Sequence, residues 1–375
     1  MLLLAFAITV SSNFDGGSIG KVEQPAPAHL RCAVEGQTDQ AGRNRQANWY
    51  YFRVDGAKGV PLTIDLVNLP GEYNFIPNRG AVQKDTIPHY SFDQITWHPV
   101  EQTEFDAAEP RMRIKITPTS NKLWIAHTPP YTVVELKRMF ARHKLKPEII
   151  GKSVEGRDLY LLTIGKGPKV IWLMSRQHSW ESFTSWAAEG FIDHLLSPAG
   201  AKLREQATFK IIPIADPDGM AHGGVRFNRH GFDLNRNWDV TDEAKMPEIT
   251  AQRKAIFQWL DSGKPIDLFL SLHNTETAEY IDGSQAAKDL VARVYDLLVK
   301  NTKFAPTRPP QIEPLKVDTG RMNVVQGLQR DRQIRAMLME QRITFNPKLG
   351  RIPTVEDRKA FGAQLAETLV AALGL

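Results

Sequence analysis

The hydrophobic pattern of the chain changes once, at the stretch HTPPYT of residues 127–132. Before it, apolar and polar residues alternate, as in VPLTIDLVNL (60–69) and RMRIKITP (111–118), which is typical of strands with one buried face. After it, short apolar segments alternate with amphipathic segments of helical period. This change predicts an antiparallel β-sandwich over residues 1–128 and an α/β domain over residues 129–375, with helices on both faces of its sheet.

Helix signals mark the start of the second domain. Thr132 and Glu135 fit a capping box, and Leu136, Met139 and Phe140 form an apolar stripe behind it. Further helices are predicted near residues 182–197, 248–262, 284–301 and 356–373. Apolar strands are predicted between them, at residues 157–165, 169–174, 209–215, 265–273 and 334–340.

Charge and composition exclude several classes of protein. The net charge of +5 is small for 375 residues and no run of five Lys or Arg residues occurs, so nucleic acid is not an expected partner. No run of 18 apolar residues occurs, so no membrane span is predicted. Cys32 is the only cysteine, which excludes an intrachain disulfide and a cysteine-based zinc site and favours a reducing compartment.

The first residues contain the sequence AFA at Ala5–Ala7, which imitates a signal-peptidase site. The segment ahead of it has no basic residue, and its apolar run is too short for a secretory signal. We therefore expect a cytoplasmic protein. The sequence does not indicate an oligomeric state.

Two imidazoles and one carboxylate follow apolar strands. His178 and Glu181 come after the segment KVIWLM and lie three positions apart, so one turn can direct both at a single cation. His273 ends another apolar strand, and the carboxyl ends of neighbouring strands share one rim. Each signal alone is weak, because H-x-x-E is common in surface turns and a strand-end His is more often hydrogen-bonded than a ligand. Together they would leave tetrahedral zinc an open position.

Two further segments would add to the same rim. Glu340 ends the apolar strand IRAMLME, where a carboxylate can serve as a general base or can face solvent. The turn-rich segment 214–239 carries Arg226, Asn235 and Arg236. Guanidinium groups suit a carboxylate or an oxyanion, although each arginine alone is also compatible with a solvated surface charge.

Together these motifs resemble the zinc metallocarboxypeptidases, and more narrowly their cytosolic carboxypeptidase-like branch. The segment at 178–197 resembles the first zinc-ligand segment, and DPDGM (216–220) and GFDLNRNWD (231–239) resemble the next two signatures. NFDGGSI (13–19) and WYYFRV (49–54) resemble the β-sandwich domain of that branch. The resemblance implies a mixed sheet of the carboxypeptidase type, one Zn²⁺ per chain, and removal of the C-terminal residue from peptides or proteins.

The resemblance also implies a role for each candidate residue. The implied zinc ligands are His178, Glu181 and His273. Glu340 would be the general base and later the acid, and Arg226 would polarise the scissile carbonyl. Asn235 and Arg236 would bind the free α-carboxylate of the last residue.

Specificity is the part of the resemblance with the least support. Arg321, in the segment VDTGRMNVV, resembles an arginine near the pocket for the terminal side chain, which would favour an acidic residue there; an ordinary surface loop fits equally well. The chain also departs from the family. It has no tyrosine after Tyr295, where many zinc carboxypeptidases carry one that closes on the substrate, and MLME lacks the usual hydroxyl residue two positions before Glu340.

Two other functions use the same residues. A zinc-dependent amidase or deacylase acting on N-acyl amino acids would need the same ligands and base. A non-catalytic zinc-containing binding protein would use the sandwich for recognition. An aromatic-rich sandwich can also bind carbohydrate, but we expect Trp49, Trp97 and Trp124 to pack the core or the contact between the domains. The arginine and asparagine set favours the peptidase, and Glu340 favours an enzyme.

Overall fold

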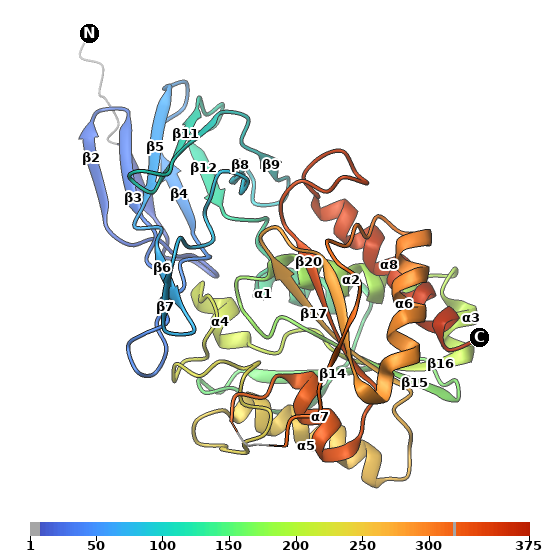
Figure 1. The fold of residues 1–375 in the computed structure, drawn as a ribbon. Coiled ribbons are helices and arrows are strands. Elements are labelled where there is room, and N and C mark those ends of the chain that lie inside the picture. Colours follow the sequence, from blue (N-terminus) through green and yellow to red (C-terminus); the bar gives the residue numbers. More distant parts are fainter. Residues whose placement is uncertain (1–7, 318–319) are drawn as a thin grey trace.

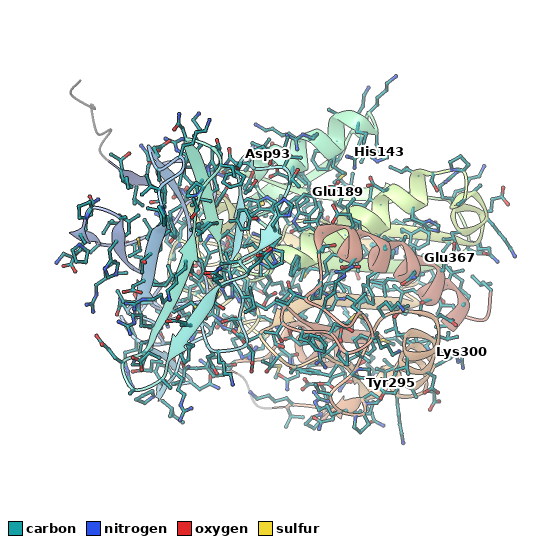
Figure 2. All side chains as sticks on the ribbon, turned by 90° about the horizontal axis from the view of Figure 1, so that it is seen from above. Asp93, His143, Glu189, Tyr295, Lys300 and Glu367 are labelled. Atoms are coloured by element: carbon teal, nitrogen blue, oxygen red, sulfur yellow. The ribbon has the colours of Figure 1, made fainter. Side chains whose placement is uncertain are left out.

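The computed structural model describes residues 8–317 and 320–375, so the signal-like residues Ala5–Ala7 lie outside the described part. The chain forms a β-rich N-terminal domain and a larger α/β domain (Figure 1), which lie side by side when seen from above (Figure 2). Strand β12 (Lys122–Ala126) ends the first and helix α1 (Val133–Arg142) begins the second. The predicted boundary at residue 128 falls in this connection.

The N-terminal domain contains two five-stranded sheets and a separate hairpin. The first sheet has the order β1 (Thr9–Ser11), β4 (Tyr51–Asp55), β12, β8 (His89–Ser91), β9 (His98–Pro99). The second has the order β10 (Thr103–Asp106), β11 (Arg111–Ile116), β5 (Leu62–Val67), β3 (His29–Ala33), β2 (Val22–Ala26). The hairpin pairs β6 (Gly71–Tyr73) with β7 (Ile76–Asn78).

The core of the sandwich lies between the two sheets. Leu62, Ile64 and Leu66 of β5 are buried there, as the period of two predicts. The pairing is antiparallel except between β3 and β5, which run parallel. Residue Asp65 points away from this core yet is also buried, because Arg113 covers it with two hydrogen bonds of 2.7 and 2.9 Å.

The α/β domain is built on one mixed eight-stranded sheet. Its order is β13 (Glu148–Lys152), β14 (Asp158–Ile164), β16 (Ala207–Ile212), β15 (Lys169–Ser175), β17 (Leu268–Thr275), β20 (Ala336–Arg342), β18 (Tyr280–Ser284), β19 (Gln311–Glu313). The four central strands, from β16 to β20, run parallel. Their carboxyl ends therefore meet at one rim, where ligands bind in sheets of this kind.

Helices cover both faces of this sheet, as predicted. One face carries α1, α2 (Ser182–Leu196), α3 (Ala201–Gln206), α6 (Lys288–Asn301) and α8 (Val355–Ala372). The other carries α5 (Pro247–Asp261) and α7 (Val324–Arg332). The short helix α4 (Pro217–His222) follows β16, and α6 is preceded by a 3₁₀ turn, Gln285–Ala287. None of the helices formed by the described residues combines the length and apolar character that a membrane span requires.

Helix α2 matters for the site because Glu181 is its N-cap residue. The helix is buried on most sides and packs directly against α8. Two glycines allow this close approach: a Cβ on Gly190 would overlap the carbonyl oxygen of Lys359, and one on Gly362 would overlap that of Ala187. The contact fixes the position of α2, and with it the direction in which Glu181 points.

The two domains share an apolar interface. Trp49 and Trp124 of the sandwich pack with Trp180 and Phe183 of the α/β domain. Trp97 packs against the edge of this cluster. These tryptophans therefore pack between the domains, as expected, close to the segment that contains His178 and Glu181.

Candidate metal centre and active site

The predicted metal ligands lie at the rim formed by two neighbouring parallel strands. His178 and Glu181 lie in the turn between β15 and α2, and His273 lies near the end of β17. Strands β15 and β17 pair directly, with Ser175 opposite Leu272. This register brings two segments almost 100 residues apart to the same point.

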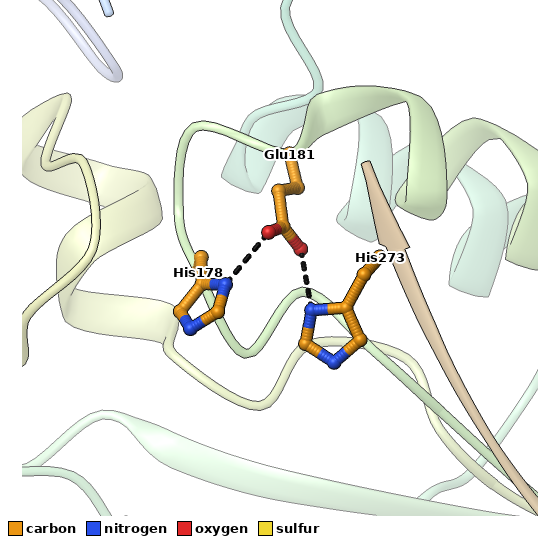
Figure 3. Close-up of side chains that lie close together, drawn as sticks. All are labelled: His178, Glu181 and His273. Atoms are coloured by element: carbon orange, nitrogen blue, oxygen red, sulfur yellow. Dashed lines mark hydrogen bonds and ion pairs between the residues drawn. The ribbon is translucent and has the colours of Figure 1, made fainter. Parts of the chain in front are cut away.

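The three side chains face one another in a buried cluster (Figure 3). The Nδ1 atom of His178 lies 2.6 Å from Oε1 of Glu181, and Nδ1 of His273 lies 3.1 Å from its Oε2. One potential ligand atom from each residue lies within 4.8 Å of the other two. The structure thus brings together the two imidazoles and the carboxylate that the sequence predicts as ligands.

The chemistry of the cluster fits a divalent cation. Glu181 Oε2 and His273 Nδ1 are buried and face each other at 3.1 Å, but neither makes a hydrogen bond within the described residues, and a cation between them would satisfy both. Burial raises the pKa of Glu181, but the two histidines outweigh it and hold the pKa at about 2. Burial lowers the pKa of His273 and favours the neutral imidazole that a metal requires.

The Nε2 atom of each imidazole lies close to polar side chains outside the cluster. Asp233 Oδ1 lies 3.3 Å from His178 Nε2. Ser271 Oγ lies 3.0 Å and Gln177 Oε1 lies 3.1 Å from His273 Nε2. Metal-binding histidines are usually oriented by such partners, which also select the tautomer. These supporting residues escaped sequence reasoning, although Asp233 lies inside the motif GFDLNRNWD.

Asp233 also connects the metal cluster to the arginine segment. Its Oδ2 accepts a hydrogen bond of 2.7 Å from Arg226 Nε, and its Oδ1 accepts one of 2.8 Å from the backbone N–H of Asn235. Burial raises the pKa of Asp233, but the guanidinium of Arg226 holds it well below the ordinary range. An ionised Asp233 therefore fixes the position of Arg226 and orients His178 at the same time.

Glu340 lies next to the cluster on strand β20. Its Cα pairs across the sheet with that of His273. Its Oε2 atom is buried and makes no hydrogen bond within the described part of the chain. Burial and the charge of Glu181 raise the pKa of Glu340 well above its ordinary value. Such a carboxylate can take up a proton and give it away again.

The remaining candidates lie along the same cavity, whose volume is about 460 Å³. Its lining includes His178, Glu181, Arg226, Asn235, Arg236 and Glu340. Asn235 is fixed through its Oδ1, which accepts a hydrogen bond of 2.9 Å from Val324 N. Arg236 donates from Nη1 to the carbonyl oxygen of Asn235 at 2.7 Å.

Arg321 lies apart from this group. It is exposed at the surface and donates a hydrogen bond of 2.9 Å to Asn74 Oδ1. It lines a neighbouring hollow that shares Arg236 with the main cavity. The main cavity instead contains the carboxylates Asp282 and Glu313.

The N-terminal domain contributes directly to the site. Oε1 of Gln37 accepts hydrogen bonds from the backbone N–H groups of Val225, Arg226 and Phe227, at 3.0, 2.7 and 2.9 Å. Its Nε2 donates to Phe227 O at 2.7 Å. One side chain of the sandwich therefore clamps the loop that carries Arg226. The sequence gives no local signal for this contact, because the partners are about 190 residues apart.

Comparison with known proteins supports the same assignment. Residues 136–305 match the zinc carboxypeptidase family, and residues 10–127 match the cytosolic carboxypeptidase N-terminal domain. Cytosolic carboxypeptidase 2 of Xenopus tropicalis is 26% identical over 96% of this chain and 41% of its own length. Cytosolic carboxypeptidase 6 of mouse is 34% identical over 35% of this chain and 26% of its own length. The chain thus spans less than half the length of these relatives.

A solved structure extends the likeness to both domains. The metallo-carboxypeptidase from Burkholderia cenocepacia superposes with a TM-score of 0.83 and 25% identity, over 98% of this chain and 99% of its own. Its match along the whole length includes the mixed sheet and the β-rich domain in front of it. The chain belongs to the zinc carboxypeptidase family, in its cytosolic carboxypeptidase-like branch.

Proposed function

We propose that the protein is a zinc-dependent carboxypeptidase that removes the C-terminal residue of peptides or proteins. The observation that carries this proposal is one cavity lined by His178, Glu181, Glu340, Arg226 and Arg236. Metal-binding groups, a carboxylate with a free oxygen and two guanidinium groups are what a protein needs to bind a chain end and hydrolyse its last amide.

His178, Glu181 and His273 are the proposed ligands of one Zn²⁺ per chain. When bound, such an ion polarises a carbonyl and lowers the pKa of a coordinated water. Cobalt and manganese can use the same ligand set, so elemental analysis of the purified protein tests the identity of the metal. A protein lacking any bound divalent metal after purification and metal addition would contradict this part of the proposal.

Glu340 is the proposed general base. It would take the proton of the attacking water and later deliver it to the leaving nitrogen. Its raised pKa suits both steps, because the group must accept a proton and hold it until the amine departs.

Arg226 and Arg236 have separate proposed roles. Arg226 is fixed by Asp233 and by the clamp on its backbone, so it would meet the developing oxyanion without reorganising. Arg236, with Asn235 beside it, would bind the terminal carboxylate. A planar guanidinium binds a carboxylate through two parallel hydrogen bonds, and this contact would restrict cleavage to chain ends.

The preference for an acidic last residue is the finer part of the proposal, and it rests on Arg321. A specific observation favours the opposite preference as a second candidate. Asp282 is neutralised by both guanidinium nitrogens of Arg308, at 2.7 and 2.5 Å. Glu313 accepts hydrogen bonds only from the amides of Asn323 and Gln326 among the described residues, so it could meet a basic side chain.

The test is a set of peptides that differ only in the last residue, ending in Glu, Leu or Lys, incubated with and without a chelator. N-acetylated amino acids assayed in parallel separate a peptidase from an amidase. They carry the same free carboxylate as the peptides, so only the group on the other side of the amide differs. Cleavage of the acylated amino acids alone would favour the amidase. One bound zinc with no cleavage of any substrate would favour a binding protein. A cytoplasmic location remains a prediction, consistent with the names of the relatives.

A further inference from the structure

One tyrosine of the N-terminal domain reaches the carboxylate-binding end of the cavity. Tyr73 ends strand β6, and Figure 1 shows the β6–β7 hairpin extending from the sandwich toward the α/β domain. Its hydroxyl oxygen accepts a hydrogen bond of 3.0 Å from Nη2 of Arg236. The guanidinium of Arg226 lies 5.4 Å from the centre of its ring. Tyr73 therefore contacts both arginines that are proposed to bind substrate.

The hairpin is held firmly on the side of its own domain. Gln46 Nε2 donates to the carbonyl oxygen of Glu72 at 2.7 Å, and Arg43 Nη2 donates to that of Phe75 at 3.1 Å. Asn44 Oδ1 accepts a hydrogen bond of 2.6 Å from Phe75 N. These hydrogen bonds fix the hairpin backbone on both sides of Tyr73, so the position of the phenol does not depend on Arg236 alone.

The hairpin tip is backbone-strained. Asn74 and Phe75, the two residues of the turn, have φ angles of 49° and 64°. Both central residues of this tight hairpin turn adopt left-handed conformations, which suits Asn-Gly and is unfavourable for a side chain as large as Phe. Such strain persists only where the surroundings impose it, and it concentrates at functional sites.

The electrostatics of Tyr73 fit an anionic ligand. Burial raises the pKa of its phenol, but Arg226 and Arg236 outweigh this and lower it overall. Because the oxygen accepts the hydrogen bond from Arg236, its own proton remains available. A carboxylate only accepts hydrogen bonds, so both the guanidinium and the phenol can donate to it.

We propose that Tyr73 is a substrate-binding residue supplied by the N-terminal domain, whose hydroxyl donates a hydrogen bond to the α-carboxylate bound by Arg236. This inference rests on the proposed carboxypeptidase function. It assigns to the sandwich a direct part in recognising the chain end. The chain has no tyrosine after Tyr295, where many zinc carboxypeptidases carry one that closes on the substrate. In this protein the tyrosine at this end of the cavity comes from the N-terminal domain.

The test is a double-mutant cycle with Tyr73→Phe and Arg236→Ala on a cleaved peptide. Tyr73→Phe should lower kcat/KM about 10-fold, mainly through a higher KM, because one charged hydrogen bond is lost. In the Arg236→Ala background the same change should cost less than twofold, because the carboxylate is no longer held beside the phenol. Metal content and melting temperature should be unchanged.

Ile76→Ala is the matched control, because Ile76 lies on the same hairpin with 66% of its surface exposed and does not line the cavity. It should keep the kcat/KM of the parent. A loss in Ile76→Ala equal to that in Tyr73→Phe, or additive losses in the cycle, would overturn the inference. So would a Tyr73→Phe variant within twofold of the parent. If the parent protein cleaves no peptide, the proposed function fails instead.

Discussion

The two ends of the cavity are built in different ways. The metal end uses His178, Glu181 and His273, which are all buried and all belong to the α/β domain. At the other end, the loop of Arg226 is clamped by Gln37, and Arg236 contacts Tyr73; both partners belong to the sandwich. The proposed metal ligands thus belong to one domain, whereas both arginines, proposed to meet the oxyanion and the terminal carboxylate, depend on contacts from the other domain.

This difference indicates why the sandwich accompanies the α/β domain. Removing the contacts of the sandwich should weaken substrate binding and leave the metal cluster intact. Changes at the metal end should abolish turnover with little effect on the domain interface. The following predictions test this division, beginning with the largest expected effect.

Glu340→Gln should lower kcat by about 10³-fold, because the amide cannot take the proton that general-base catalysis requires. Zinc content should remain at the parental value, because Glu340 is not one of the three clustered ligand residues. Steady-state kinetics with elemental analysis measures both. Glu367→Gln, on the surface of α8, is the control and should behave as the parent. Full turnover by Glu340→Gln would refute the assignment of the base.

Arg236→Ala should lower kcat/KM by about 100-fold, with most of the change in KM. The substrate carboxylate would lose a charged, half-buried partner that can donate two parallel hydrogen bonds. Arg332→Ala, which removes a surface arginine of α7 remote from the cavity, should leave the kinetics unchanged. An Arg236→Ala variant with an unaltered KM would show that the carboxylate binds elsewhere.

Gln37→Ala should lower kcat/KM by about 10-fold while zinc content stays constant. Three backbone N–H groups of the arginine loop would lose their acceptor, so Arg226 would be less well fixed. Gln24→Ala, on the exposed strand β2, is a matched control. If Gln37→Ala lost zinc as readily as activity, the two ends of the cavity would not be independent.

Acid should destabilise the protein through two buried imidazoles at the domain interface, since His89 packs against Phe183 and His127 against Trp180. Burial lowers the pKa of His89 to about 4 and that of His127 to about 3, below the ordinary 6.5. As the pH falls, these imidazoles are protonated in the unfolded chain before they are protonated in the folded protein. Their contribution to the free energy of unfolding is therefore fully present above pH 6.5 and is lost as the pH drops toward 4. The expected loss by pH 5 is about 1–2 kcal/mol for each imidazole.

Thermal unfolding between pH 7 and 5 measures this loss. His127→Phe, which keeps a ring between Tyr50 and Trp180, should flatten the pH dependence. His230→Gln, at an exposed position, should leave it unchanged. The same slope in all three proteins would show that these buried imidazoles do not control acid stability.

The sequence predicted the parts of the molecule that follow a repeating pattern. The four longest predicted helices appear as α2, α5, α6 and α8, within a few residues of the expected bounds. The mixed sheet and the β-rich front domain are also confirmed. Helix α7 escaped prediction because it has only nine residues, and β19 because it has only three.

At the site, the sequence predicted side chains that follow strands and missed those that reach in from afar. His178, Glu181 and His273 could be placed together because parallel strands end at a common rim. Gln37 lies in an isolated β-bridge and Tyr73 in a strand of three residues, and their partners are 190 and 163 residues away, so no local pattern marks them. Contacts between domains are set by how the finished domains dock.

The most direct test of the account compares two peptides that differ only at the C-terminus, one with a free carboxylate and one amidated. Mass spectrometry of each after incubation with the zinc-loaded protein reports what was removed. We expect the free peptide to become shorter by its last residue and the amidated one to remain whole. Equal cleavage of both peptides, or cleavage at an internal bond of either, would contradict the claim that the site recognises a free C-terminal carboxylate.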